Sequence, residues 1–175
     1  MIPINEAIES GAWLQARLPA PSPSDGNFIT ITIGGDKENE LEHKNLITHF
    51  HFKVTDFSKI VLTDIDNPEY LEVSLESNIW LLKFEIINVL KDSVPFYDIE
   101  ALLQLTDDEG YKFSIFKDDS YLLSNSSFAK KSGLASLRFK NLAPKIRKLG
   151  AFAFELPDEF DTLFITVKGG EISEV

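Results

Sequence analysis

Apolar and polar residues alternate with a period of two along most of the chain beyond residue 28, which is the spacing of β-strands that bury one face. Short segments rich in polar residues, glycine or proline separate these stretches. The expected strands cover residues 28–33, 46–55, 60–62, 70–75, 78–88, 99–105, 111–115, 134–142, 150–156 and 162–167. Many short strands with turn-rich connections and little helical pattern predict an all-β antiparallel sandwich or barrel.

The clearest strand is 78–88, where Trp80, Leu82, Phe84 and Ile86 share one face and charged residues occupy the other. A wide apolar face opposite a mixed one predicts a central strand with one dry side. The same alternation in 46–55 sets three apolar residues against three polar ones. The apolar residues are Phe50, Phe52 and Val54, and the polar ones are His49, His51 and Lys53.

Two connections carry recognisable turn chemistry. The sequence Asp107-Asp108-Glu109-Gly110 is typical of a hairpin, with Gly110 where positive φ is needed. Residues 64–69 superficially resemble a calcium loop, but the absence of a glycine and the presence of Pro68 break the EF-hand pattern. We therefore interpret 64–69 as a connection in which Asn67 accepts a turn conformation that Pro68 fixes.

The first 27 residues follow a different pattern. Residues 4–17 are expected to form a short helix, with Asn5 as N-cap and Gly11 as a weak point. Prolines 19, 21 and 23 then favour extended backbone. The predicted organisation is an extension and Pro-rich linker over residues 1–27, followed by one sandwich domain over residues 28–175.

Composition narrows the chemistry. Fourteen Phe residues favour sheet, and the absence of Cys excludes disulfides, thiol nucleophiles and cysteine-based metal sites. Residues 79–90 are the longest apolar run, and three polar residues interrupt it, so no membrane span is expected. The N-terminus has no signal-peptide pattern, which predicts a cytoplasmic protein if Met1 is the native start.

Two segments together carry a family resemblance. One is Trp80-Leu81-Leu82-Lys83-Phe84-Glu85-Ile86 with the later Leu103-Gln104-Leu105-Thr106-Asp107-Asp108-Glu109-Gly110-Tyr111-Lys112-Phe113, and the other is residues 141–157, NLAPKIRKLGAFAFELP. Over about residues 50–167 the chain resembles bacterial telokin-like immunoglobulin-like domains, which include secreted immunoprotective antigens. The resemblance implies an immunoglobulin-like antiparallel β-sandwich that is non-catalytic and secreted or attached to the cell envelope. That family tends to place Pro-Gly where this chain has Pro144-Lys145, so the turn is expected to differ.

Charge is distributed unevenly. The net charge is −11, which argues against nucleic acid as the main partner. Residues 130–148 nevertheless contain seven basic residues and no acidic one, which leaves −18 on the rest of the chain. The candidate basic patch comprises Arg138, Lys140, Lys145, Arg147 and Lys148. Such a patch suits an acidic protein, an anionic glycan or head-to-tail self-association, whereas the plainer alternative is that it solvates an edge strand.

Enzymatic signatures are sparse. The chain has no G-x-S-x-G, P-loop, G-x-G-x-x-G or H-E-x-x-H motif. Alternate residues His49 and His51 project from one strand face at a reach that suits a shared metal, with His43 or a carboxylate as third ligand. Polar residues on a solvent face explain the same pattern more simply, so we expect neither metal nor cofactor.

The sequence therefore predicts a non-catalytic binding or adhesion module that presents sandwich surfaces to a protein or glycan. One alternative is a cytoplasmic accessory or inhibitor domain that docks on a partner through residues 19–23 or the basic segment. A hydrolase with an unrecognised site is the third hypothesis.

Overall fold

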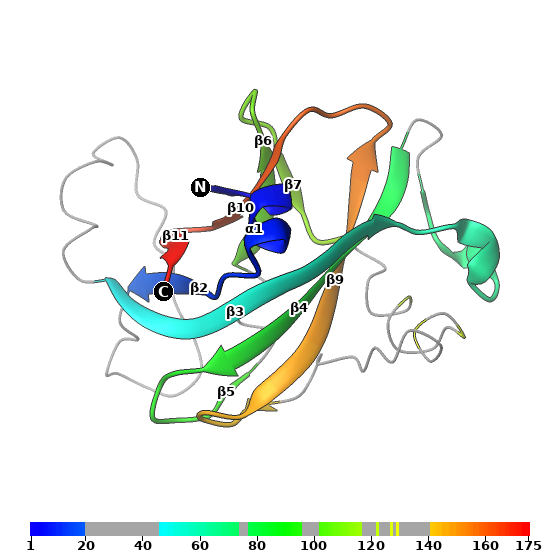
Figure 1. Cartoon of the computed structure of the whole chain (residues 1–175). Helices are drawn as coiled ribbons and strands as arrows, with labels where there is room; N and C mark the ends of the chain where they lie inside the picture. Colours follow the sequence, from blue (N-terminus) through cyan, green and yellow to red (C-terminus); the bar gives the residue numbers. More distant parts are fainter. Residues whose placement is uncertain are drawn as a thin grey trace.

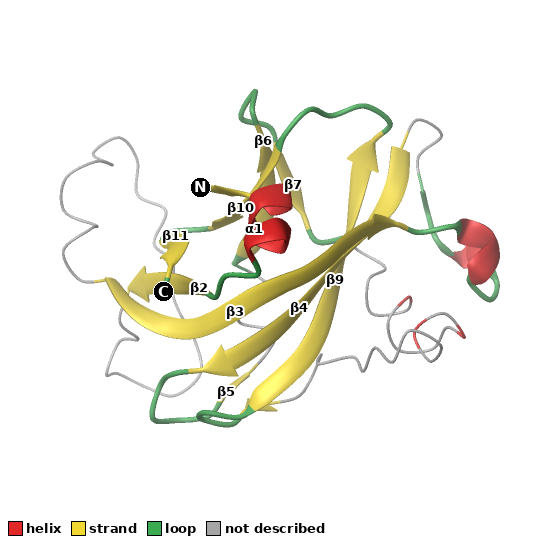
Figure 2. Ribbon diagram, in the orientation of Figure 1, coloured by secondary structure: helices red, strands yellow, loops and turns green. Residues whose placement is uncertain are grey.

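The computed structural model describes residues 1–19, 46–73, 77–95, 102–116, 122, 127, 129 and 141–175. The strands are β1 Ile2–Pro3, β2 Leu14–Pro19, β3 Leu46–Lys59, β4 Ser77–Asn88, β5 Val94–Pro95, β6 Leu103–Asp107, β7 Lys112–Ser114, β8 Asn141–Leu142, β9 Arg147–Pro157, β10 Leu163–Val167 and β11 Glu171–Glu174. They build a five-stranded sheet in the order β11-β2-β3-β4-β9, a four-stranded sheet in the order β1-β10-β6-β7, and a β5-β8 pair. Every pairing between these strands is antiparallel, so the described part of the chain is an all-β sandwich (Figures 1 and 2).

Large side chains from both sheets fill the space between them. The rings of Phe84 in β4 and Phe152 in β9 stack with their centroids 4.8 Å apart. Leu105 of β6 and Ile165 of β10, both fully buried, belong to the same cluster from the opposite sheet. A void of about 10 Å³ in this core has only apolar lining residues. That is about the space of one water molecule, so this void holds no ligand.

The outer face of the five-stranded sheet is divided in two. Ile79 and Leu81 of β4 lie on this face and are 1% and 0% exposed, because a second apolar cluster with Ile65, Leu71 and Phe116 covers them. The prediction that one side of this strand is dry and the other mixed is therefore wrong for its first half. Beyond Leu81, the outward residues of β4 are only half-buried.

The N-terminal residues belong to the sandwich. The predicted helix is present only as α1, Ile4–Ser10, whose N-cap is Pro3 and not Asn5. Gly11 ends the helix at φ +59°, and β2 then pairs with β3 on one side and β11 on the other. Residues 1–19 thus contribute strands to both sheets and are not an extension that precedes them. Residues 20–27 of the predicted linker and the expected strand 28–33 lie outside the described residues.

The structure confirms some of the other expected strands and turns and contradicts the rest. The strands expected at 46–55, 78–88, 150–156 and 162–167 are confirmed as β3, β4, β9 and β10, as is the β6–β7 hairpin, where Gly110 has φ +93°. The strand expected at 60–62 and the described part of that expected at 70–75 are wrong, because short 3₁₀ turns form instead at Leu62–Asp64 and Pro68–Tyr70. Asn67 does take the left-handed conformation, at φ +52°. Within the described ranges, no helix is long and apolar enough to cross a membrane.

The two faces of β4 make a quantitative prediction. Phe84→Ala should lower the free energy of unfolding by about 3–5 kcal/mol, because it removes a buried ring that stacks on Phe152. Lys83→Ala is the control, since its ion pair with Asp56 at 3.1 Å is partly exposed and is worth at most about 1 kcal/mol. Urea unfolding measures both. Equal losses would contradict the assignment of faces.

Candidate binding surface at the start of β9

One buried amide organises the end of the sheet where β4 finishes. Asn88 is 1% exposed, and its side-chain nitrogen donates to the carbonyls of Asp92 at 2.7 Å and Leu142 at 2.8 Å. Its side-chain oxygen accepts from the backbone N–H of Leu90 at 2.9 Å, and its backbone carbonyl accepts from Lys145 N at 2.9 Å. A fully satisfied buried amide of this kind specifies one arrangement of the segments that it joins. Asn88 therefore joins the turn after β4, strand β8 and the turn before β9.

The turn before β9 has an unusual residue at its third position. Ile146 N donates to the carbonyl of Ala143 at 3.3 Å, so residues 143–146 form a β-turn. With Pro144 second and Lys145 third at φ +61°, the turn is of type II, in which glycine is preferred at the third position. Lys145 therefore takes a backbone conformation that glycine favours, although this chain has no glycine there. A non-glycine residue in this conformation costs on the order of 1 kcal/mol.

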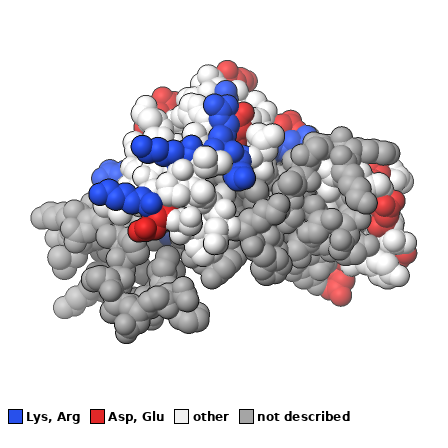
Figure 3. Space-filling view, turned by 90° about the horizontal axis from the view of Figure 1, so that it is seen from below, with Lys and Arg blue, Asp and Glu red and all other residues white. Residues whose placement is uncertain are grey.

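The turn and the first residues of β9 present charge and apolar area together. Lys145, Arg147 and Lys148 are exposed, and Ile146 and Leu149 are 49% and 59% exposed. We call these five residues, 145–149, the basic–apolar surface. Viewed from this end of the molecule, lysine and arginine side chains lie along two sides of an uncharged area, with a carboxylate group beside them (Figure 3).

Neighbouring strands extend this surface across the open half of the sheet face. The register places Arg147 opposite Ile87 and Leu149 opposite Glu85. Arg147 lies 3.4 Å from the Glu85 carboxylate and 6.0 Å from the centre of the Trp13 ring. Because 64% of the arginine side chain is exposed, the ion pair is weak and leaves the guanidinium accessible to a partner.

The structure brings together part of the predicted basic patch. Lys145, Arg147 and Lys148 are consecutive or nearly so at one end of the sheet, whereas Arg138 and Lys140 lie outside the described residues. Sequence reasoning missed Ile146, Leu149 and Trp13, because 146–149 were interpreted as a turn before a strand beginning at Gly150. The strand begins at Arg147 instead, and the alternation of Arg147, Leu149 and Ala151 was the available signal.

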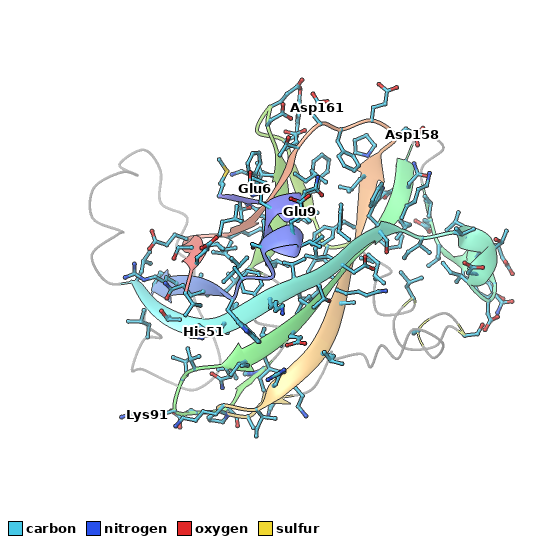
Figure 4. All side chains as sticks on the ribbon, in the orientation of Figure 1. Glu6, Glu9, His51, Lys91, Asp158 and Asp161 are labelled. Atoms are coloured by element: carbon cyan, nitrogen blue, oxygen red, sulfur yellow. The ribbon has the colours of Figure 1, made fainter. Side chains whose placement is uncertain are left out.

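The two histidines considered as metal ligands have different environments, and the interpretation that both lie on a solvent face is wrong for His49. His49 is buried, and its Nε2 lies 3.1 Å from the carbonyl oxygen of Pro19, so this nitrogen carries the proton and donates. Burial lowers the pKa of His49, and the bond to Pro19 only partly opposes that effect. His51 is half-buried and pairs with Gln15 and Ile87 in the sheet register (Figure 4). In the part of the chain that the structure describes, which does not include His43, no three His, Asp or Glu residues are grouped to hold a metal ion.

One acidic residue in the segment that resembles a calcium loop has a structural role. The carboxylate of Asp66 accepts from the backbone N–H of Ser127 at 3.1 Å and from its hydroxyl at 2.6 Å. Asp66 therefore joins two segments that are 61 residues apart.

Comparisons with known proteins do not identify a family. No protein-family profile and no curated protein matches the sequence. A crystal structure described as a conserved hypothetical protein from Bacillus anthracis is similar over 72% of this chain and 87% of that one, with 14% identity and a TM-score of 0.48. A structure described as "a putative lipoprotein (ycdA)" from Bacillus subtilis is similar over 73% of this chain and 36% of that one, with 12% identity and a TM-score of 0.43. Likeness at this level indicates no function.

The role assigned to Asn88 can be tested by an isosteric change. In Asn88→Asp a carboxylate replaces the buried amide that donates to the carbonyls of Asp92 and Leu142, which should lower the free energy of unfolding by about 2–4 kcal/mol. Asn141→Asp, at an exposed position in β8, is the matched control and should change it by less than about 0.5 kcal/mol. Denaturant unfolding at neutral pH measures both. A loss no greater than that of the control would remove Asn88 from its organising role.

The buried histidine predicts a pH dependence. Because the folded-state pKa of His49 is below the unfolded value of 6.5, the unfolded chain binds more protons between the two values. The stability that neutral His49 contributes is therefore complete above 6.5 and is lost as the pH falls toward the folded pKa. His49→Gln should reduce this dependence more than His51→Gln does, as measured by urea unfolding from about pH 7.5 to pH 5. Equal slopes in the two variants would contradict the prediction.

Proposed function

We propose that this domain is a non-catalytic binding module that docks on a protein partner through the basic–apolar surface. The observation that carries the proposal is that three cations and two aliphatic side chains are all exposed within five consecutive residues, 145–149. Cations attract an acidic partner over a distance, and the aliphatic groups of Ile146 and Leu149 provide area for close contact. An anionic glycan is the second candidate, but aliphatic side chains favour a protein over a sugar.

Rigidity supports a docking role. The Asn88 hydrogen bonds tie the turn to β4, so little backbone freedom is lost there on association. Lys145 occupies a backbone conformation that glycine would adopt at lower cost. Strain of this kind is typical of functional positions, and here it places a cation beside Ile146.

The sequence resemblance to telokin-like domains is in keeping with this proposal. It implies a non-catalytic immunoglobulin-like domain that is exported or attached to the cell envelope, where a docking surface would serve adhesion or assembly. A cytoplasmic accessory or inhibitor domain would use the same surface in the same way.

Paired charge reversals test the proposal. Arg147→Glu/Lys148→Glu should weaken capture of a partner by more than about tenfold at 0.1 M salt, and the difference should shrink at 1 M as screening lengths fall. Lys112→Glu/Lys168→Glu carries the same charge change at exposed positions in β7 and just after β10, away from the surface, and is the matched control.

The measurement is affinity capture from an extract followed by titration of the captured protein. The proposal requires a protein that wild type and the control variant retain and that the Arg147/Lys148 variant releases. Equal retention by all three proteins, or retention that does not depend on salt, would contradict it.

A further inference from the structure

The basic–apolar surface has a complement at the opposite end of the same molecule. The loop after β9 contains Asp158, Glu159 and Asp161, and the β6–β7 hairpin contains Asp107, Asp108 and Glu109. We call these six residues the acidic pole. Leu163 pairs with Asp107, so the loop and the hairpin tip are neighbours. All six residues except Asp107 are exposed, and Lys112 is the basic residue nearest to the hairpin in the register.

The acidic pole also carries an exposed aromatic side chain. Tyr111 is 64% exposed directly after the hairpin turn, and its backbone N–H donates to the carboxylate of Asp107 at 2.8 Å. Tyrosine is enriched at protein interfaces because a large rigid ring is combined with a polar end. The acidic pole therefore offers apolar area as well as negative charge, as the basic–apolar surface offers apolar area as well as positive charge.

Strand β9 separates the two surfaces. It begins at Arg147 and ends at Pro157, a length of roughly 35 Å at 3.3 Å for each residue. Figure 1 shows β9 running from the end where β4 finishes to the end where the β6–β7 hairpin lies. Figure 4 places Asp158 and Asp161 at that second end and Lys91, which follows β4, at the first. One strand of the core thus holds opposite charges at opposite ends.

From this arrangement we infer that the occupant of the basic–apolar surface is the acidic pole of a second copy of the chain. The inference rests on the proposed function and names its partner. Ile146 and Leu149 would face Tyr111, while Lys145, Arg147 and Lys148 would face the carboxylates. Because the two surfaces differ, the contact is head-to-tail. Copies then add one after another, unless the rotation that relates successive copies closes them into a ring.

Net charge sets the conditions for association. At −11 each, two copies repel each other over long distances when salt is low. Raising the salt to about 0.1–0.15 M shortens the screening length to about 8–10 Å, which weakens this repulsion more than it weakens pairs in contact. At about 1 M the contact pairs are screened as well. Association is therefore strongest at intermediate salt, which is unlike purely hydrophobic association.

Two variants test the inference, and each replaces charged residues of one surface by neutral ones. One variant removes the basic surface through Lys145→Gln, Arg147→Gln and Lys148→Gln. The other removes part of the acidic pole through Asp108→Asn, Glu109→Gln and Glu159→Gln. Each should be monomeric alone, and an equimolar mixture should form a dimer and nothing larger, because each copy keeps one functional surface.

Sedimentation velocity across a protein-concentration series and a salt series measures the result. Wild type should show an average mass that increases with concentration beyond a dimer. The control Lys168→Gln removes one positive charge at an exposed position just after β10, outside both surfaces, and should associate as wild type does.

A monomeric wild type at every salt concentration would overturn the inference, as would a mixture of the two variants that stays monomeric. Either outcome leaves the proposed function standing, because capture of a different protein by residues 145–149 is measured separately. Self-association that the Arg147/Lys148 reversal abolishes, with no other protein captured, would support the second copy as the occupant.

Discussion

The hydrogen bonds of one buried amide determine what this molecule presents to its surroundings. Asn88 stands where the longest antiparallel pairing of the five-stranded sheet ends, and it satisfies carbonyl and N–H groups from two other segments. An apolar residue there would remove the partner of these groups, and the loss at the buried Leu142 carbonyl alone would cost about 1–3 kcal/mol. The core below holds β4 and β9 in register, and Asn88 transmits that register to the exposed turn. The position of residues 145–149 is therefore a consequence of the fold.

The outer face of the five-stranded sheet is divided into a covered half and an open half. Ile65, Leu71 and Phe116 cover Ile79 and Leu81. Only the second half of β4 therefore has an open outer face, and that half adjoins the basic–apolar surface. At the other end of β9, exposed carboxylates gather on the turn of the β6–β7 hairpin and on the loop in which Phe160 packs against Trp80. The sandwich thus separates charge along its long strand while keeping its interior apolar.

Local patterns predicted the parts of the fold that depend on neighbours in the chain. Alternation identified β3 and β4, and turn chemistry identified Gly110 and Asn67. The alternation of Leu14, Ala16 and Leu18 also indicated β2, but a helical spacing that began at Ile4 obscured it, although Gly11 ends that helix. The role of Asn88 was beyond such reasoning, because its bond to Leu142 spans 54 residues and a polar residue at a strand end has no distinctive local pattern. The basic residues were visible in the sequence, whereas the aliphatic and aromatic side chains beside them were recognised only from the fold.

Native-state hydrogen exchange at the amides of Leu90 and Lys145 tests most directly whether the core holds the binding surface in place. Both amides donate to Asn88, one to its side chain and one to its backbone carbonyl. If Asn88 joins the turn to the sheet as described, both should exchange only through openings about as costly as those that expose the amides of β4. Exchange at the rate of an unprotected loop, with β4 still protected, would show that residues 145–149 are not held by the core.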